Sequence, residues 1–280
     1  MLDFIPSIVS VVSFGLVGVS SKKSIDIIGR HKAIVYAYIV LVFLLIVGAV
    51  VLGQSISFPL EMMPLYAVQV AMGALGVIAW YKALDYGKVS ITAAVGKTYV
   101  LLVLASSIFF LGEQLSIGQI MGAVLMVGST VMIAIGKTGK IKLEKWMIYL
   151  AIAILCRTYY YTFIKTFVSE LGVYPATLLL ELGVAGFVVA FHFLRGRDLS
   201  PPKLSDMKYP IIPGILIFIG TVFYSMSINE IGAALTATVS AGGPIINTIG
   251  SYILLKEKLD LQKYSAIILI VIGLIMIFVL

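Results

Sequence analysis

Three charged residues interrupt otherwise apolar segments of the chain. Lys97, Arg157 and Glu181 each stand in the central part of a run long enough to span a bilayer. An unpaired charge at that depth costs about 2.5–3.5 kcal/mol. Glu181 can neutralise one of the two cations but not both, so the three residues keep a net positive charge. This favours a ligand with a carboxylate or phosphate group. The alternative is a buried ion pair that only ties helices together.

Arg157 is the first candidate for binding such a ligand. Its guanidinium stays protonated at working pH and can hold a carboxylate or phosphate with two parallel hydrogen bonds. Lys97 is the second candidate, and because it can also lose its proton when desolvated, protons are a candidate coupling ion. Tyr161 lies four residues after Arg157 and shares its helix face. Tyr81, near the end of an apolar run, is expected either to line a ligand cavity or to lie in the membrane interface.

A helix break is expected at Gly242, Gly243 and Pro244. Proline lacks an amide proton and glycine is conformationally permissive, so the local hydrogen-bond ladder is interrupted. Freed backbone groups are tolerated at membrane depth where they line a cavity or are covered by other helices. Asn247, one turn further on, adds a polar side chain that serves either as a ligand contact or as a hydrogen bond between helices.

These residues belong to a chain dominated by apolar segments. Apolar residues make up 61% of its 280 residues and charged residues 12%, whereas soluble domains have about half and about a quarter. We therefore expect an all-α integral membrane protein with ten transmembrane helices joined by short loops. The expected helices are Phe4–Ser21, Ala33–Leu52, Pro64–Leu84, Val89–Phe110, Ser116–Gly136, Trp146–Val168, Tyr174–Leu194, Pro210–Ile228, Gly232–Leu255 and Lys263–Leu280.

Basic residues are distributed unevenly among the loops. All but Lys97, Arg157 and Lys165 of the 20 Lys and Arg lie in or beside alternate loops. Cations near helix ends stay on the cytoplasmic side, so we expect both termini outside a plasma membrane. The net charge of +7 is then a topology signal and not a nucleic-acid surface. Lys165 is expected either to snorkel to the interface or to attract anions at an entrance.

The chain also contains an internal repeat. The stretch from Gly87 to Glu113 aligns with the stretch from Gly232 to Glu257 when one gap is allowed. Each half has five segments, an odd number, so the second copy would cross the membrane in the opposite direction. Inverted repeats are typical of secondary transporters, whose substrate site lies near the bilayer midplane. We expect five-helix repeats at 1–140 and 141–280 that form one membrane-embedded unit.

Enzymatic motifs do not appear in the sequence. The single cysteine, Cys156, excludes an internal disulfide and a Cys-based metal site, and the two histidines lie near helix ends. There is no phosphate-binding glycine loop, no His-Glu metal motif and no recognisable nucleophile–base pair. We therefore expect no enzymatic activity, no catalytic residues, no metal, no cofactor and no nucleic-acid partner. A membrane enzyme or a scaffold is the least favoured alternative.

Several motifs resemble the drug/metabolite transporter superfamily, EamA type, over essentially the whole chain. They are the small-residue turn after the third segment, Leu-Gly-Glu-Gln-Leu at 111–115, Lys-Glu-Lys-Leu at 256–259, and Pro244 ahead of the latter. The resemblance implies a ten-helix carrier whose cavity is lined mostly by helices 1, 3, 4, 6, 8 and 9, with helices 5 and 10 peripheral. Two features depart from the family. Its members place both termini in the cytoplasm, and Lys97 stands in helix 4 where helix 9 has its proline.

These features together predict a secondary transporter of a small anionic or zwitterionic metabolite, such as an amino acid or related organic acid. It would work by alternating access, with Arg157 and Lys97 holding the acidic group in the central cavity. The alternative is a proton-coupled exporter of cationic drugs. Such a carrier needs an acidic residue in its cavity, and since the first segment has no carboxylate, only Glu181 could supply it.

Overall fold

The computed structural model describes residues 2–135, 144–255 and 261–279, and the regular elements in these ranges are all helices. Six stretches within them are long and apolar enough to cross a membrane, so the expected all-α membrane class is confirmed. These stretches are Ile5–Ile28, Arg30–Val51, Leu60–Tyr86, Lys145–Leu171, Val173–Leu194 and Leu204–Ser240. Shorter apolar helices cover Tyr99–Leu111, Ile117–Ser129 and Tyr264–Ile277.

The first three helices follow the first three predicted segments. Gly29 alone joins the first helix to the second, and its φ of 80° is a conformation that glycine adopts without strain. Short 3₁₀ turns at Leu2–Phe4 and Leu60–Met62 lead into the first and third helices. The helices are α1 (Ile5–Ile28), α2 (Arg30–Val51) and α3 (Met63–Tyr86).

The fourth predicted segment is split, where the sequence suggested one continuous helix. Its two parts are α4 (Val89–Gly96) and α5 (Tyr99–Leu111). At the split, the Thr98 amide and the Thr98 hydroxyl both donate to the carbonyl of Val95, at 3.0 Å and 2.8 Å. A hydroxyl that bonds to nearby backbone offers the chain an alternative to the regular helical ladder. Lys97 therefore lies in a tight turn inside the span.

The middle of the chain follows the predicted segments. Ser116 and Gln119 exchange side-chain to backbone hydrogen bonds at 3.0 Å and 3.1 Å, which form a capping box at the start of the next helix. Gly172 alone joins the helix that ends at Leu171 to the helix that begins at Val173, and a loop after Leu194 leads to the next long helix. The helices are α6 (Ile117–Ile135), α7 (Lys145–Leu171) and α8 (Val173–Leu194).

The eighth and ninth predicted segments share a long helix. After a 3₁₀ turn at Leu204–Asp206, α9 (Lys208–Ser240) runs through a kink at Gly232, where φ is 82° and ψ is 169°. The chain then breaks at Ala241 and Gly242. Pro244 has no amide proton with which to continue the ladder. The remaining helices are α10 (Gly243–Leu255) and α11 (Leu261–Val279).

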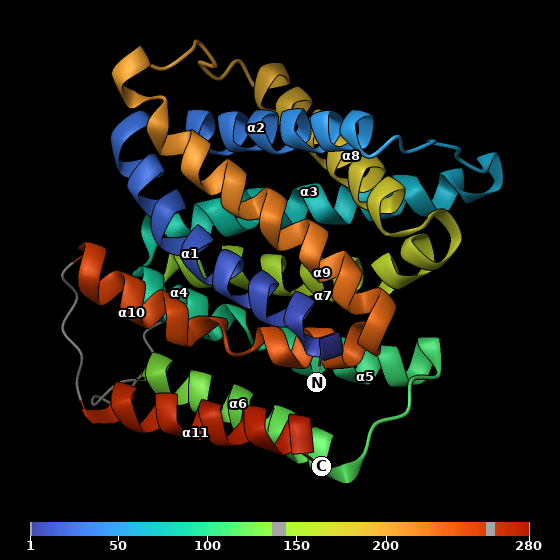
Figure 1. Cartoon of the computed structure of the whole chain (residues 1–280). Helices are drawn as coiled ribbons and strands as arrows, with labels where there is room; N and C mark the ends of the chain where they lie inside the picture. The colour runs from blue at the N-terminus through green and yellow to red at the C-terminus, as the bar shows by residue number, and fades with distance from the viewer. Residues whose placement is uncertain (1, 136–143, 256–260, 280) are drawn as a thin grey trace.

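The two halves of the chain repeat one arrangement. In each, a glycine (Gly87 or Gly232) is followed after about ten residues, or three helical turns, by a helix break. The two broken spans run in opposite directions (Figure 1), and α4 packs on α10 while α5 packs on α9. Helices α6 and α11 lie side by side at one edge of the molecule. The two helix breaks consequently meet at the centre.

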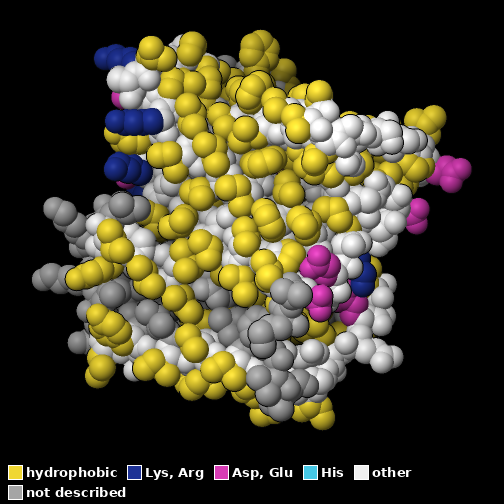
Figure 2. All heavy atoms as spheres, viewed as in Figure 1, with side chains coloured by type: hydrophobic (Ala, Val, Ile, Leu, Met, Phe, Trp, Pro, Cys, Tyr) yellow, Lys and Arg dark blue, Asp and Glu magenta, His cyan; other side chains and the backbone are white. Residues whose placement is uncertain are grey.

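Charged side chains gather at opposite ends of the helices. Figure 2 shows most of the visible Lys and Arg at the end where α1 finishes and α2 begins, and Asp and Glu, with some Lys or Arg among them, at the other end; an apolar band lies between the two ends. We call these the basic end and the acidic end. At the basic end Lys32 pairs with Asp198 at 2.8 Å. The hydrogen bonds from Lys32 and from Ser200 hold the pKa of Asp198 well below its usual range.

Candidate substrate cavity

Lys97, Arg157 and Glu181 all line one central cavity. It contains about 950 Å³ of empty space, part of which opens to solvent. Its walls come from α1, α3, α4, α7, α8 and α9, with single residues from α2 and α5. None of its described lining residues comes from α6 or α11, the helices that the family resemblance places at the periphery.

Arg157 points into this cavity from the middle of α7. Its guanidinium carbon lies 4.2 Å from the centre of the Trp80 ring, a cation–π contact across to α3. The two helices approach closely at Gly76, where an added Cβ would lie 3.1 Å from the Cβ of Cys156. Among the described residues no carboxylate forms an ion pair with Arg157. The aromatic ring orients the guanidinium but leaves its charge unmatched.

Lys97 reaches the cavity from the turn between α4 and α5. Its ammonium donates to the Ser240 hydroxyl at 3.4 Å, at the last residue of α9. It also lies 5.6 Å from the ring centre of Tyr99, whose own hydroxyl is 3.2 Å from that of Ser240. In the described part of the chain no ion pair includes Lys97. The cavity wall therefore holds a second cation without a fixed carboxylate.

Glu181 supplies the acidic group of the cavity from α8. Its side chain is buried, and its Oε1 accepts a hydrogen bond from the Tyr160 hydroxyl at 3.2 Å. No described Lys or Arg lies within ion-pair distance of it, so it neutralises neither Arg157 nor Lys97 by direct contact. The cavity thus has acidic and basic groups at separate positions.

Aromatic rings make up much of the remaining wall. Tyr161 stacks on Tyr99 with ring centres 5.2 Å apart and contacts Tyr224 at 4.8 Å. We call Tyr99, Tyr161 and Tyr224 the tyrosine layer. Tyr81 also lines the cavity, and its hydroxyl is 3.1 Å from that of Ser21. Both Trp80 and Tyr81 thus belong to the cavity wall, one of the two placements open for Tyr81 from the sequence.

The remaining candidate residues lie at the second break. Gly242 is in the turn between α9 and α10, and Gly243 begins α10. An added Cβ on Gly243 would lie 3.1 Å from Cε of Lys97, so the break is in direct contact with the lysine. The side chains of Pro244 and Asn247 lie outside the described part of the chain.

Two polar side chains near the site, one buried and one part-buried, have contacts that were not recognised from the sequence. Gln69 is fully buried and donates to the carbonyl of Tyr160 at 2.8 Å, which fixes the residue that bonds Glu181. Glu113 contacts Lys165 and the backbone at Ala233 and Ala234. Gln69 is a single polar residue in an apolar run and belongs to no motif, so only its burial in the structure identifies it as a residue of interest. Glu113 was marked by the repeat, which identified it as a turn residue without indicating a contact.

Comparison with protein families agrees with this architecture. The profile of the EamA-like transporter family matches residues 4–135 and again residues 144–279. The chain belongs to the EamA-like transporter family. The double match covers both halves and establishes the two-repeat architecture of this EamA protein, a multi-pass membrane transporter. The predicted family is therefore confirmed.

Known structures share the fold of this EamA protein. A solved structure described as "Crystal structure of protein" superimposes with a TM-score of 0.81 at 16% sequence identity. The match covers 98% of this chain and 95% of that chain. At this identity the likeness concerns the fold alone. No curated protein matches the sequence.

Proposed function

We propose that this EamA transporter carries a small anionic or zwitterionic metabolite, an amino acid or a related organic acid, across the plasma membrane. The observation that supports this most directly is the pair of cations on the cavity wall. Neither Arg157 nor Lys97 has a carboxylate partner among the described residues. Because a charge held at membrane depth without an anion is costly, a substrate carboxylate that supplies the anion is bound favourably.

The separate placement of the acidic group suits a zwitterion. We propose that Arg157 holds the substrate carboxylate with two parallel hydrogen bonds, and that Lys97 attracts the same group. Glu181 would accept the substrate ammonium. Tyr161 and Tyr81 would pack against the rest of the molecule. Asn247 stays a proposed contact.

The wider transport scheme rests on the same proposal. The two repeats, 1–140 and 141–280, would rock as one membrane unit around the cavity in alternating access, with the break at Gly242, Gly243 and Pro244 as a hinge. The basic end would face the cytoplasm, which places both termini outside. Protons are the proposed coupling ion.

Counterflow in proteoliposomes tests the substrate class. The panel pairs each amino acid with its amide, which lacks the carboxylate, and with its decarboxylated amine, and it includes organic acids. We expect exchange of the free acids and not of the amides or amines. Arg157→Ala should abolish exchange, and Arg157→Lys should retain part of it. Exchange of amides as fast as acids, or an Arg157→Ala rate equal to wild type, would refute the proposal.

A second candidate function is the proton-coupled export of cationic drugs. It is favoured by Glu181, a buried cavity carboxyl with no cation at ion-pair distance in the described chain. Such a group can bind either a proton or a cationic substrate. Ethidium efflux from energised vesicles tests this function. Efflux that Glu181→Gln abolishes and Arg157→Ala leaves intact would favour the drug exporter over the anion carrier.

A further inference from the structure

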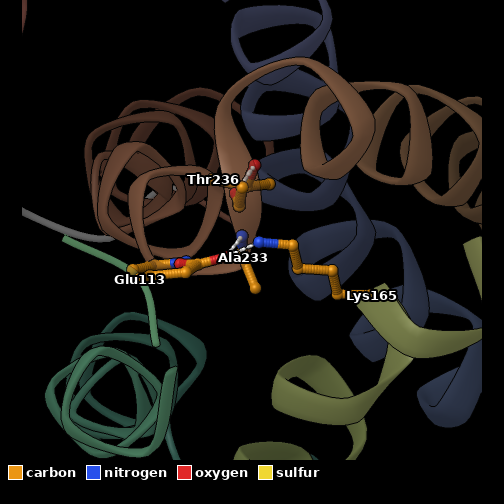
Figure 3. Close-up of polar contacts among 6 residues, drawn as sticks. Glu113, Lys165, Ala233 and Thr236 are labelled. Carbon is orange, nitrogen blue, oxygen red and sulfur yellow. Dashed lines mark hydrogen bonds and ion pairs between the residues drawn. The ribbon is translucent and has the colours of Figure 1, made fainter. Parts of the chain in front are cut away.

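A single carboxylate ties the two repeats together at the acidic end (Figure 3). Glu113 follows α5 in the first repeat. Its Oε1 accepts from the amide of Ala233 at 2.8 Å and from Lys165 Nζ at 2.5 Å, and its Oε2 accepts from the amide of Ala234 at 2.7 Å. Its three donors all belong to the second repeat. We call this contact the Glu113 latch.

The local sequence explains why the latch forms. Gly232 turns the backbone with a φ of 82°, so the helical segment that follows exposes the amides of Ala233 and Ala234 at its start. A helix start carries partial positive charge and favours a carboxylate. An added Cβ on Gly232 would lie 2.8 Å from Oε1 of Glu113, so only glycine permits this approach. On the other side, Gly112 with a φ of 67° directs the chain out of α5 toward the contact.

A smaller cavity lies next to the central one, near the part of α7 that carries the latch lysine. It has about 270 Å³ of empty space, shares Tyr161 and Glu181 with the central cavity, and is lined further by Tyr224, Ser225 and Ile164 among others. Ile164 is the neighbour in α7 of Lys165, which forms the latch. The latch lysine is therefore the sequence neighbour of a residue that lines the wall of this smaller cavity.

The described ion pairs that join the two repeats differ in exposure between the two ends of the molecule. At the acidic end, the Glu113 side chain is only 10% exposed and accepts from three donors. At the basic end, the described ion pair between the repeats is Lys32–Asp198, and its aspartate side chain is 69% exposed. Exposed ion pairs contribute little, and part-buried contacts with several hydrogen bonds contribute more.

On these grounds we propose that the Glu113 latch is the outer gate: it holds the cavity closed toward the acidic end and must open for substrate to pass. The role of the latch as a gate rests on the proposed transport function. The closure itself can be tested by a measurement of conformation that requires no substrate. Removal of the carboxylate should raise the population of the state that is open at the acidic end.

Cysteine accessibility tests the latch directly. The single native cysteine is replaced by Cys156→Ala, and Ser225→Cys is introduced because Ser225 is fully buried and lines the smaller cavity. A membrane-impermeant methanethiosulfonate reagent is applied to whole cells and, separately, to inverted vesicles. We expect Glu113→Ala to raise the labelling rate about tenfold from one membrane face only, which corresponds to about 1.4 kcal/mol.

The matched control is Lys32→Ala, which breaks the exposed ion pair at the basic end. We expect it to leave labelling from the acidic end at the rate of the parent. Glu113→Gln keeps an acceptor oxygen and should give a smaller rise than Glu113→Ala, and Thr177→Cys serves as an alternative reporter if Ser225→Cys does not fold. A folded Glu113→Ala protein that labels at the parent rate, or a Lys32→Ala protein that labels equally fast, would overturn the latch. Neither result depends on the substrate panel.

Discussion

Close contact at Gly73 gives a prediction whose size follows from the structure. An added Cβ at Gly73 of α3 would lie 2.7 Å from a ring carbon of Tyr160 and 2.7 Å from a methyl of Val184. Both neighbours belong to packed helices, α7 and α8. The Tyr160 ring has little freedom to move, because its hydroxyl bonds Glu181 and its carbonyl accepts from Gln69. We therefore expect Gly73→Ala to overpack this interface.

Gly186 of α8 provides the matched control. An added Cβ there would meet no atom within 4 Å. Both substitutions gain the same helix propensity, about 1 kcal/mol, so the difference between the two variants isolates the steric cost. Overpacking in a well-packed interior costs about 1–3 kcal/mol. We expect Gly73→Ala to be less stable than Gly186→Ala by that amount, and Gly186→Ala to equal or exceed wild type.

Thermal unfolding of the purified protein in detergent measures this difference. The single cysteine, Cys156, is buried, so a thiol-reactive fluorescent dye reports unfolding without an added label. Gly73→Ala should unfold at a lower temperature than Gly186→Ala. If Gly73→Ala were as stable as Gly186→Ala, the close approach of α3 to α7 and α8 would be wrong.

Three further predictions concern the kink, the cation and the buried carboxyl. Gly232→Ala should destabilise the protein by about 1–3 kcal/mol in the same dye assay, because its φ of 82° strains alanine and the new Cβ collides with Glu113. Trp80→Leu should weaken substrate binding by about 1 kcal/mol through loss of the contact with Arg157. A double-mutant cycle with Arg157→Lys, which retains part of the exchange and is read as exchange half-saturation, should show that the two effects are not additive. Tyr160→Phe should cost about 1–3 kcal/mol of thermal stability, because Glu181 loses its hydrogen bond; stability equal to wild type would mean that water or another group replaces the hydroxyl.

The helical elements and the family could be predicted from the sequence because they depend on local composition. Apolar runs of sufficient length identify spans, and most helix boundaries follow them. The repeat was also visible, since Gly87 and Gly232 occupy matching places. The split of the fourth span at Lys97 was not predicted. Its Gly-Lys-Thr sequence is a weak breaking signal, and the hydroxyl of Thr98 that bonds Val95 matters only in the folded turn.

Contacts within the site were harder to predict than its members. Arg157, Lys97 and Glu181 were selected because charges at membrane depth are costly, and that reasoning needs no three-dimensional information. Their partners depend on packing between helices distant in sequence. Lys165 shows this clearly: the sequence left it as a snorkelling residue or an entrance cation, and the structure pairs it with Glu113, 52 positions away. Neither residue carries a local signal for the other.

The two helix breaks meet around Lys97, which forms no ion pair with a carboxylate in the described part of the chain. Helix α4 ends at Gly96, directly before Lys97, and α9 ends at Ser240, whose hydroxyl accepts from the lysine. A helix C-terminus favours a nearby cation, but α5 and α10 begin at Tyr99 and Gly243, and the partial positive charge of their starts opposes that effect. The described contacts of the ammonium are with the Ser240 hydroxyl and the Tyr99 ring, which leave it free of a competing side-chain anion.

The same breaks give the two repeats different chemistry. In the second repeat, Gly-Gly-Pro interrupts the helix with residues that carry no charge, and in the first repeat the matching turn carries Lys97. Gly243 allows the lysine to approach, since an added Cβ would lie 3.1 Å from its Cε. One repeat thus supplies the cation and the other supplies the space for it. In the proposed alternating access, rocking of the repeats about this contact would change the distance between Lys97 and Arg157 of α7, and with it the site that a bound anion occupies.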